Sequence, residues 1–399
     1  MTTVQEHPAT RGAAAGTIGA ATALLDAYRS GTDRFFASPT RTLLARGVHA
    51  PVADGERPLP DRVQDALAAA HAAGVPDPLV IGAIPFAPAA PSALVVPAGL
   101  RRAPALAADP LTALPAPRPE PAAWSVHPVP APERYAEAVE AAVARMTAGG
   151  LRKVVLARAL DLTGGRAPDV PAMLQRLARG DARGYTFAVP TPDGTTLLGA
   201  SPELLVSRRG TTLVANPLAG SAPRSDDLAE DVRRAAALLQ SAKDLHEHAV
   251  VVDAMRAVLA PYCAALDVPD KPTLVRTATM WHLSTTLTGT LAEPSLSALD
   301  LACALHPTPA VCGAPTALAR EVIGELEPFD RHLYTGMVGW GDSRGDGEWV
   351  VTIRCAEASE RGLRLYAGAG VVPSSDPAAE TAETGAKFRT FLDAVGAAL

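Results

Sequence analysis

Apolar residues alternate with turn residues through much of the first hundred positions of the chain. Leu79 to Phe86 is an almost continuous apolar run, which predicts a strand buried on both faces. A second such run, from Lys153 to Leu160, follows a Gly-Gly pair and predicts another buried strand. Between Pro104 and Pro132 the chain carries nine prolines, so we expect an extended crossing segment there, without regular structure.

Helical spacing of apolar residues predicts the remaining large elements. One face of a helix contains Tyr135, Val139, Ala142, Val143 and Met146, and Gly149-Gly150 ends it. Ser225 is the expected N-cap of a helical stretch that runs to about Cys263. Further helices are expected at 296–305, 315–326 and 376–397.

Two segments predict antiparallel strands. Residues 195–216 resemble a hairpin that turns at Arg209-Gly210. Residues 334–372 resemble a three-stranded meander with turns at 343–347 and 359–362. Because runs of strands are separated by blocks of helix, the pattern indicates an α+β fold rather than a doubly wound parallel sheet.

Composition narrows the class of protein. The chain has 399 residues, 48% of them hydrophobic, which is ample for a large core. With a formal net charge of −6, the chain lacks the excess of basic residues that is typical of nucleic-acid-binding proteins. No apolar run is as long as a membrane span. The four cysteines are scattered, so neither a thiolate metal site nor a disulfide framework is expected. We expect a cytoplasmic protein without nucleic-acid or membrane partners, a monomer or at most a weak dimer.

Four carboxylates suggest a cation site. Asp244 and Glu247 are three residues apart on one predicted helix, and Glu380 and Glu383 repeat that spacing on another. A spacing of three residues places both acids of a pair on one helix face. Either pair by itself is also what an ordinary solvated helix face looks like. If the two faces meet, they offer only oxygen ligands, a set that suits a hard cation such as Mg²⁺.

Six longer phrases in the chain are specific enough to compare with known families. They are Lys153-Val-Val-Leu-Ala-Arg, Ser201-Pro-Glu-Leu-Leu, Asn216-Pro-Leu-Ala-Gly, Leu305-His-Pro-Thr-Pro-Ala-Val-Cys-Gly-Ala-Pro, Gly345-Asp-Gly-Glu-Trp-Val-Val-Thr-Ile-Arg-Cys-Ala and Tyr366-Ala-Gly-Ala-Gly-Val-Val. Together they resemble the chorismate-utilising enzymes, and within them most closely the isochorismate synthases of catechol-siderophore pathways. The resemblance covers nearly the whole chain and is strongest from about residue 153 to 392.

The resemblance implies a single large chorismate-binding domain of two stacked antiparallel sheets flanked by helices. We expect a flexible N-terminus at 1–16, a supporting part at 17–132 and the catalytic core at 133–399. It also implies a reversible, Mg²⁺-dependent conversion of chorismate to isochorismate, in which water attacks C2 while the C4 hydroxyl leaves. The product would feed the synthesis of 2,3-dihydroxybenzoate.

The resemblance also assigns the acid–base chemistry. Lys153 matches the general base, which requires its pKa to fall from about 10.4 toward neutrality. Glu203 matches the general acid, which has to stay protonated near neutral pH.

The remaining site residues match positions that bind metal or substrate. Glu247 and Glu383 match the Mg²⁺ ligands, and Asp244 and Glu380 match carboxylates that bind through water or orient those ligands. The substrate-binding positions are Arg354, Tyr334, Gly368, Gly370, Lys387, His282, Ala310 and Gly220. An arginine fork suits a carboxylate, and glycines allow the backbone to approach it closely.

Two alanines distinguish this chain from members of the family that catalyse other reactions of chorismate. Ala219 stands where some aminodeoxychorismate synthases carry a lysine nucleophile, which favours water as the nucleophile here. Ala310 stands where anthranilate and salicylate synthases usually carry threonine, which favours release of isochorismate with its pyruvyl group retained. Salicylate synthesis, amination of chorismate and a catalytically silent chorismate-binding protein remain the alternatives. Ala222 departs from the family by replacing an arginine.

Overall fold

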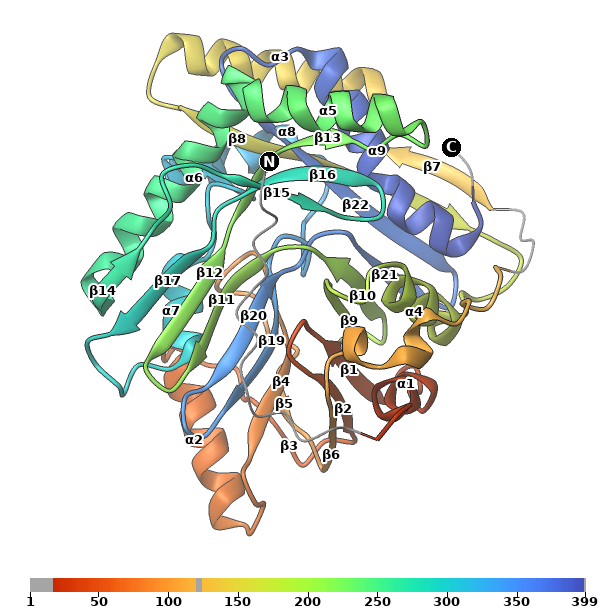
Figure 1. Ribbon diagram of the computed structural model, residues 1–399, viewed down its shortest axis with the longest axis vertical. Coiled ribbons are helices and arrows are strands. Elements are labelled where there is room, and N and C mark those ends of the chain that lie inside the picture. The colour runs from red at the N-terminus through yellow and green to blue at the C-terminus, as the bar shows by residue number, and fades with distance from the viewer. Residues whose placement is uncertain (1–16, 120–123, 398–399) are drawn as a thin grey trace.

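The computed structural model describes residues 17–119 and 124–397. Two large antiparallel sheets lie face to face in it (Figure 1). Across the first sheet the strands are β18 (Gly313–Ala314), β8 (Lys153–Thr163), β22 (Gly362–Val371), β21 (Cys355–Ser359), β10 (Thr196–Ser201), β9 (Tyr185–Pro190), β1 (Asp33–Ala37), β2 (Thr42–Arg46) and β6 (Gly99–Ala103), with β7 (Ser125–Val129) also paired to β8.

The second large sheet and a small third sheet complete the strand architecture. The second contains, in spatial order, β14 (Cys263–Asp267), β17 (Leu287–Leu291), β12 (Thr212–Asn216), β11 (Leu204–Arg209), β20 (Gly347–Val351), β19 (Met337–Asp342), β4 (Leu79–Ile84), β5 (Val95–Val96) and β3 (Ala50–Pro51). The third contains β13 (Leu218–Pro223), β16 (Met280–Ser284) and β15 (Thr273–Arg276). In Figure 1 it lies across one end of the two large sheets.

Helices cover the outer faces of both large sheets. On the first sheet lie α1 (Ala20–Asp26), α3 (Pro132–Ala148), α4 (Val170–Gly180), α8 (Thr316–Leu326) and α9 (Pro377–Val395). On the second lie α2 (Leu59–Ala72), α6 (Ala242–Leu259) and α7 (Ala298–Leu305). Helix α5 (Leu228–Gln240) packs on β13 and β16, and short 3₁₀ turns occur at η1 (Leu106–Ala108), η2 (Pro110–Ala113) and η3 (Ala260–Tyr262). The predicted α+β architecture of two stacked sheets is confirmed.

The core has separate layers because strand side chains alternate between the two faces of a sheet. Phe35 on β1 packs among the helices, whereas its neighbour Phe36 packs between the sheets. Leu44 and Leu43 on β2 repeat this division. Both faces of each sheet are therefore covered, which explains why these strands are continuously apolar in the sequence.

The predicted helices are present, with one interruption. The stretch expected from Ser225 to Cys263 is two helices, α5 and α6, divided at Ser241. The Ser241 hydroxyl accepts a hydrogen bond from the Asp244 N–H and so caps α6. The cap of α5 is Asp227 rather than Ser225, because the Asp227 carboxylate accepts from the Glu230 N–H.

Two strand predictions were wrong in topology. The meander expected at 334–372 is four strands, of which β19 and β20 belong to the second sheet and β21 and β22 to the first. Likewise, the predicted hairpin at 195–216 begins with β10 in the first sheet and continues with β11 and β12 in the second; only the turn at Arg209-Gly210 is as expected. In both segments the chain crosses between sheets without losing its apolar alternation.

The proline-rich segment is more regular than predicted. It contains η1, η2 and strand β7, which pairs with β8. Strands from residues 33–103 belong to both large sheets, and the division into 17–132 and 133–399 stays a prediction. The N-terminus expected to be flexible, 1–16, lies outside the described residues. Within the described ranges, the helices are too short or too polar to cross a bilayer.

Candidate active site

A cavity lies at the end of the two large sheets, beneath the third. Residues from β8, β13, β16, β22, α6 and α9 line it, together with loops between the sheets. Most of the residues predicted for the site line this cavity: Glu203, Gly220, Glu247, His282, Ala310, Tyr334, Arg354, Gly368, Gly370, Glu383 and Lys387. Lys153, Asp244 and Glu380 do not line it directly. The cavity therefore brings together residues that are up to 232 positions apart, from Val155 to Lys387.

Two of the points where the chain crosses between the large sheets supply central side chains of the cavity. Glu203 lies between β10 and β11, and Arg354 lies between β20 and β21. Arg354 has a φ of 50°, a left-handed conformation that a non-glycine residue seldom adopts, and Thr335 in the same cavity has a φ of 58°. Strained backbone of this kind often occurs at functional sites. Sheet crossing thus places these side chains at the cavity.

Glu203 has the environment of a protonated carboxylic acid. Its side chain is almost fully buried. Burial raises the pKa of Glu203 to about 8, although the Leu218 N–H and the charges of Lys153 and Lys387 oppose the shift. A carboxyl group with this pKa holds its proton at neutral pH and is able to donate it.

Lys153 is paired with a carboxylate at the back of the cavity. Its side chain has no exposed surface, and its Nζ lies 2.9 Å from Oε1 of Glu247. Gly370 permits this arrangement, because a Cβ at that position would lie 2.1 Å from Oε1 of Glu247 and 3.1 Å from Cε of Lys153. The glycine in this phrase thus makes room for the ion pair.

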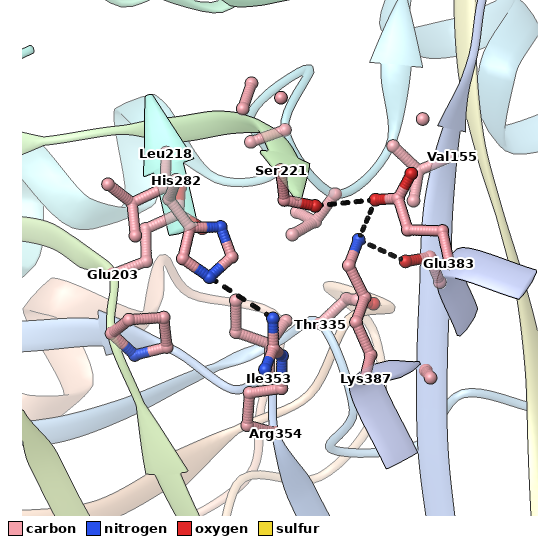
Figure 2. A pocket seen from close by; sticks show the side chains of 18 of the residues that line it. Val155, Glu203, Leu218, Ser221, His282, Thr335, Ile353, Arg354, Glu383 and Lys387 are labelled. Carbon is pink, nitrogen blue, oxygen red and sulfur yellow. Dashed lines mark hydrogen bonds and ion pairs between the residues drawn. The ribbon is translucent and has the colours of Figure 1, made fainter. Parts of the chain in front are cut away.

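Glu383 forms a second lysine–carboxylate pair (Figure 2). Its Oε1 accepts a hydrogen bond from the Ser221 hydroxyl at 2.8 Å and lies 2.7 Å from Nζ of Lys387. Burial favours a higher pKa for Glu383, but the charge and hydrogen bond of Lys387 outweigh it and lower that pKa. Lys387 also donates to the Gly368 carbonyl at 2.8 Å.

Glu380 forms a third pair, with a lysine that sequence reasoning missed. Nζ of Lys243 lies 2.5 Å from Oε1 of Glu380. Burial and the neighbouring charge of Glu383 raise the pKa of Glu380. The signal in the sequence that could have identified Lys243 is the scarcity of lysine, since the chain has only four, at 153, 243, 271 and 387. In the structure three of these four pair with the carboxylates of the site.

Asp244 lies on the first turn of α6, close to the backbone of β13. A Cβ on Gly220, which has a φ of 77°, would lie 3.0 Å from Cβ of Asp244. Burial raises the pKa of Asp244, and the Glu247 charge adds to this effect. The charges of Glu247 and Glu383 both raise the pKa of Asp244, so carboxylates from the two acidic helices lie within electrostatic range of one another.

The chemistry of these side chains fits a hard cation. Among residues 17–119 and 124–397, three or more acidic, His or Cys side chains do not gather closely enough to form a ready ligand cage. Each of Glu247, Glu380 and Glu383 instead faces a lysine. The set nevertheless consists of carboxylate oxygens alone, and the buried Oε2 of Glu380 has no hydrogen-bond partner among the described residues. Such oxygens are the ligands that Mg²⁺ prefers.

The opposite wall carries donors that suit an anionic substrate. Arg354 is buried and donates to Nε2 of His282 at 3.3 Å, as Figure 2 shows. Burial lowers the pKa of Arg354 to about 10 and that of His282 well below its usual value, so a cationic arginine faces a neutral imidazole. Burial also raises the pKa of Tyr334, whose phenol therefore remains a donor.

Further residues in or next to the cavity were not among the predicted site residues. Ser221 holds Glu383, and Tyr366 stacks on Tyr334 with ring centroids 4.9 Å apart. His248 donates from Nδ1 to the Ala219 carbonyl and accepts from the Thr285 hydroxyl at 2.7 Å. Burial lowers the pKa of His248 to about 4, so this imidazole is neutral and orients the backbone at the cavity wall.

The chain belongs to the chorismate-binding enzymes. The family model described as "Chorismate binding enzyme" matches residues 105–396. Within this family the chain is similar to isochorismate synthases. It is 53% identical to the isochorismate synthase DhbC of Bacillus subtilis, across 94% of this chain and 96% of that protein.

Two further comparisons agree. The vibriobactin-specific isochorismate synthase of Vibrio cholerae is 42% identical, across 94% of both chains. A crystal structure from Bacillus anthracis, described as a 2,3-dihydroxybenzoate-specific isochorismate synthase, superposes with a TM-score of 0.88 at 49% identity, covering 94% of this chain and 99% of that one. The predicted resemblance to siderophore-type isochorismate synthases is confirmed.

Proposed function

We propose that this enzyme converts chorismate to isochorismate with Mg²⁺ as cofactor, and that the product is used for 2,3-dihydroxybenzoate synthesis. The observation that carries the proposal is the placement of two buried groups: Glu203 lines the cavity with a raised pKa that favours its protonated form, and Lys153 lies behind the cavity wall, paired with Glu247. The names of the relatives from Vibrio cholerae and Bacillus anthracis support the siderophore assignment.

Lys153 and Glu203 divide the acid–base work in this proposal. Water is a weak nucleophile, so Lys153 takes its proton as water bonds to C2. Hydroxide is a poor leaving group, so Glu203 gives its proton to the C4 oxygen as the C4–O bond breaks. Lys153 acts as a base only when its ammonium has left the ion pair with Glu247 and has lost a proton. The reverse reaction exchanges the two roles.

The substrate's two carboxylates are assigned to opposite sides of the cavity. Glu247 and Glu383 would hold the cation, with Asp244 and Glu380 behind them. When bound, Mg²⁺ would neutralise the ring carboxylate and withdraw charge from the ring. Arg354, Tyr334 and the backbone N–H groups near Gly368 and Gly370 bind the other carboxylate, on the enolpyruvyl group.

Two alanines support water addition without pyruvate loss. Ala219 and Ala310 both line the cavity. Ala219 has no amine to attack C2, and Ala310 has no hydroxyl to take part in elimination. The first absence favours water as the nucleophile, and the second favours a product that keeps its enolpyruvyl group.

The deciding experiment is incubation of the purified enzyme with chorismate and MgCl₂, with products separated by chromatography. Isochorismate as the main product, formed without glutamine or ammonia and lost on chelation with EDTA, is the expected result. Salicylate or anthranilate as the main product would refute the assignment. Starting from isochorismate, the same enzyme should produce chorismate.

A further inference from the structure

Lys243 lies where the two acidic helices face each other. It is in the first turn of α6, four residues before Glu247, so both side chains project from one face of that helix. Its Nζ lies 2.5 Å from Oε1 of Glu380 on α9. A lysine from α6 thus bridges to the carboxylates of α9.

The Lys243 ammonium lies within electrostatic range of three carboxylates, two of which also pair with a lysine of their own. Besides Glu380, the Lys243 charge interacts with Glu383 and Glu247. The oxygen of Glu380 that does not meet Lys243, Oε2, is buried without a hydrogen-bond partner in the described part of the chain. The four carboxylates of the cluster, Asp244, Glu247, Glu380 and Glu383, therefore outnumber its three lysines, Lys153, Lys243 and Lys387.

We propose that the Lys243 ammonium is an internal substitute for the divalent cation, held by the carboxylates in the metal-free enzyme and displaced toward solvent when the cation binds. This inference rests on the cation of the proposed function. It assigns Lys243 a positioning role and no contact with the reacting atoms.

The other two lysines of the cluster are less able to leave. Lys153 has no exposed surface, and Lys387 is held by both Glu383 and the Gly368 carbonyl. The Lys243 side chain is 29% exposed, whereas its partner Glu380 is only 1% exposed. Lys243 therefore has a route to water, and Glu380 stays behind with its charge in the cluster.

Displacement makes a clear prediction for cation affinity. A divalent cation that binds to the wild-type protein has to separate Lys243 from Glu380. Its net binding free energy is therefore smaller than it would be at the same carboxylates without the lysine. Removing the amine removes this competitor. Lys243→Met keeps the length and helix propensity of the side chain without its charge.

The test measures cation binding without substrate. Mn²⁺ is titrated into the protein and free Mn²⁺ is followed by electron paramagnetic resonance. Lys243→Met should bind Mn²⁺ roughly fivefold to tenfold more tightly than wild type. Lys243→Arg, whose guanidinium is able to make two bonds to Glu380, should bind it more weakly. Lys271→Met, which removes an exposed lysine elsewhere, is the matched control and should leave the affinity unchanged.

A second measurement, of thermal unfolding, distinguishes a change in cation binding from a failure of the variant to fold. The metal-free Lys243→Met protein should melt at a lower temperature than wild type, and Mg²⁺ should raise its Tm by more. Equal or weaker Mn²⁺ binding by a folded Lys243→Met protein would overturn the inference. Chorismate turnover by wild type is measured in parallel, because its absence would overturn the proposed function, whereas unchanged Mn²⁺ affinity in Lys243→Met overturns only the role of Lys243.

Discussion

Lys153 and Glu247 form a buried ion pair, 2.9 Å from Nζ to Oε1, beside a glycine backbone that leaves no room for a side chain. The proposed base and a proposed cation ligand are therefore partners in the metal-free enzyme. Their interaction links the acid–base chemistry to the state of the carboxylate cluster. Variants of either residue should disturb the other.

Removing one partner of this pair should cost more than removing both. Lys153→Met should lower the free energy of unfolding by about 3–5 kcal/mol, because it leaves the Glu247 carboxylate buried without its partner. Lys153→Met combined with Glu247→Gln should recover part of this loss. Urea unfolding of the wild type and three variants in EDTA measures the coupling; strictly additive losses would show that the two groups do not interact.

Glu203 should make activity depend on pH in a defined direction. Burial raises its pKa to about 8, and the proposed acid is active only when protonated. The kcat for chorismate should therefore fall as pH rises through about 8. Glu203→Gln has the same shape without the proton and should lose roughly 10²- to 10⁴-fold in kcat at pH 7. A calorimetric titration of this variant with chorismate and Mg²⁺ should still show binding, and turnover within tenfold of wild type would exclude Glu203 as the acid.

The same raised pKa should affect stability. Between the ordinary carboxyl pKa of about 4.3 and a value of about 8, the folded protein binds a proton at Glu203 that the unfolded chain has released. The contribution of Glu203 to the free energy of unfolding therefore falls as pH rises through this window. Compared with wild type, Glu203→Gln should gain relative stability between pH 5 and pH 9, as measured by urea unfolding; a constant difference would contradict the raised pKa.

Gly370→Ala should damage the site through Glu247. The added methyl would lie 2.1 Å from Oε1 of Glu247, so the carboxylate has to move and the ion pair with Lys153 is lost. We expect at least a tenfold loss of kcat/KM for chorismate and weaker Mn²⁺ binding. Gly324→Ala, in helix α8 with open space around the new methyl, is the control and should leave activity unchanged and stability equal or slightly higher.

The four carboxylates should differ in importance. Glu383→Gln should abolish most activity and weaken Mn²⁺ binding strongly, because it removes a charge that lines the cavity. Asp244→Asn should cost less, because Asp244 lies outside the cavity lining. Kinetics across a Mg²⁺ series compare the two variants; a larger loss in Asp244→Asn would reverse the assignment of inner and outer carboxylates.

Much of this arrangement was predictable from local sequence. The helical spacing of Asp244 with Glu247 and of Glu380 with Glu383 identified two acidic faces, and α6 and α9 carry them. The strand beginning at Lys153 and the turn at Arg209-Gly210 were also predicted correctly. These features depend on periods of two and 3.6 residues, which are visible within a few turns of chain.

The amino-acid sequence by itself determined the family, the α+β class and the side chains able to carry the chemistry. Only the tertiary structure decided that the chain crosses between sheets at Glu203 and at Arg354, because apolar alternation continues unchanged through a crossing when both sheets are covered on both faces. It also decided which lysine meets which carboxylate. Lys243 and Glu380 are 137 positions apart, and their contact depends on how α6 and α9 pack around the cavity, which no local pattern encodes.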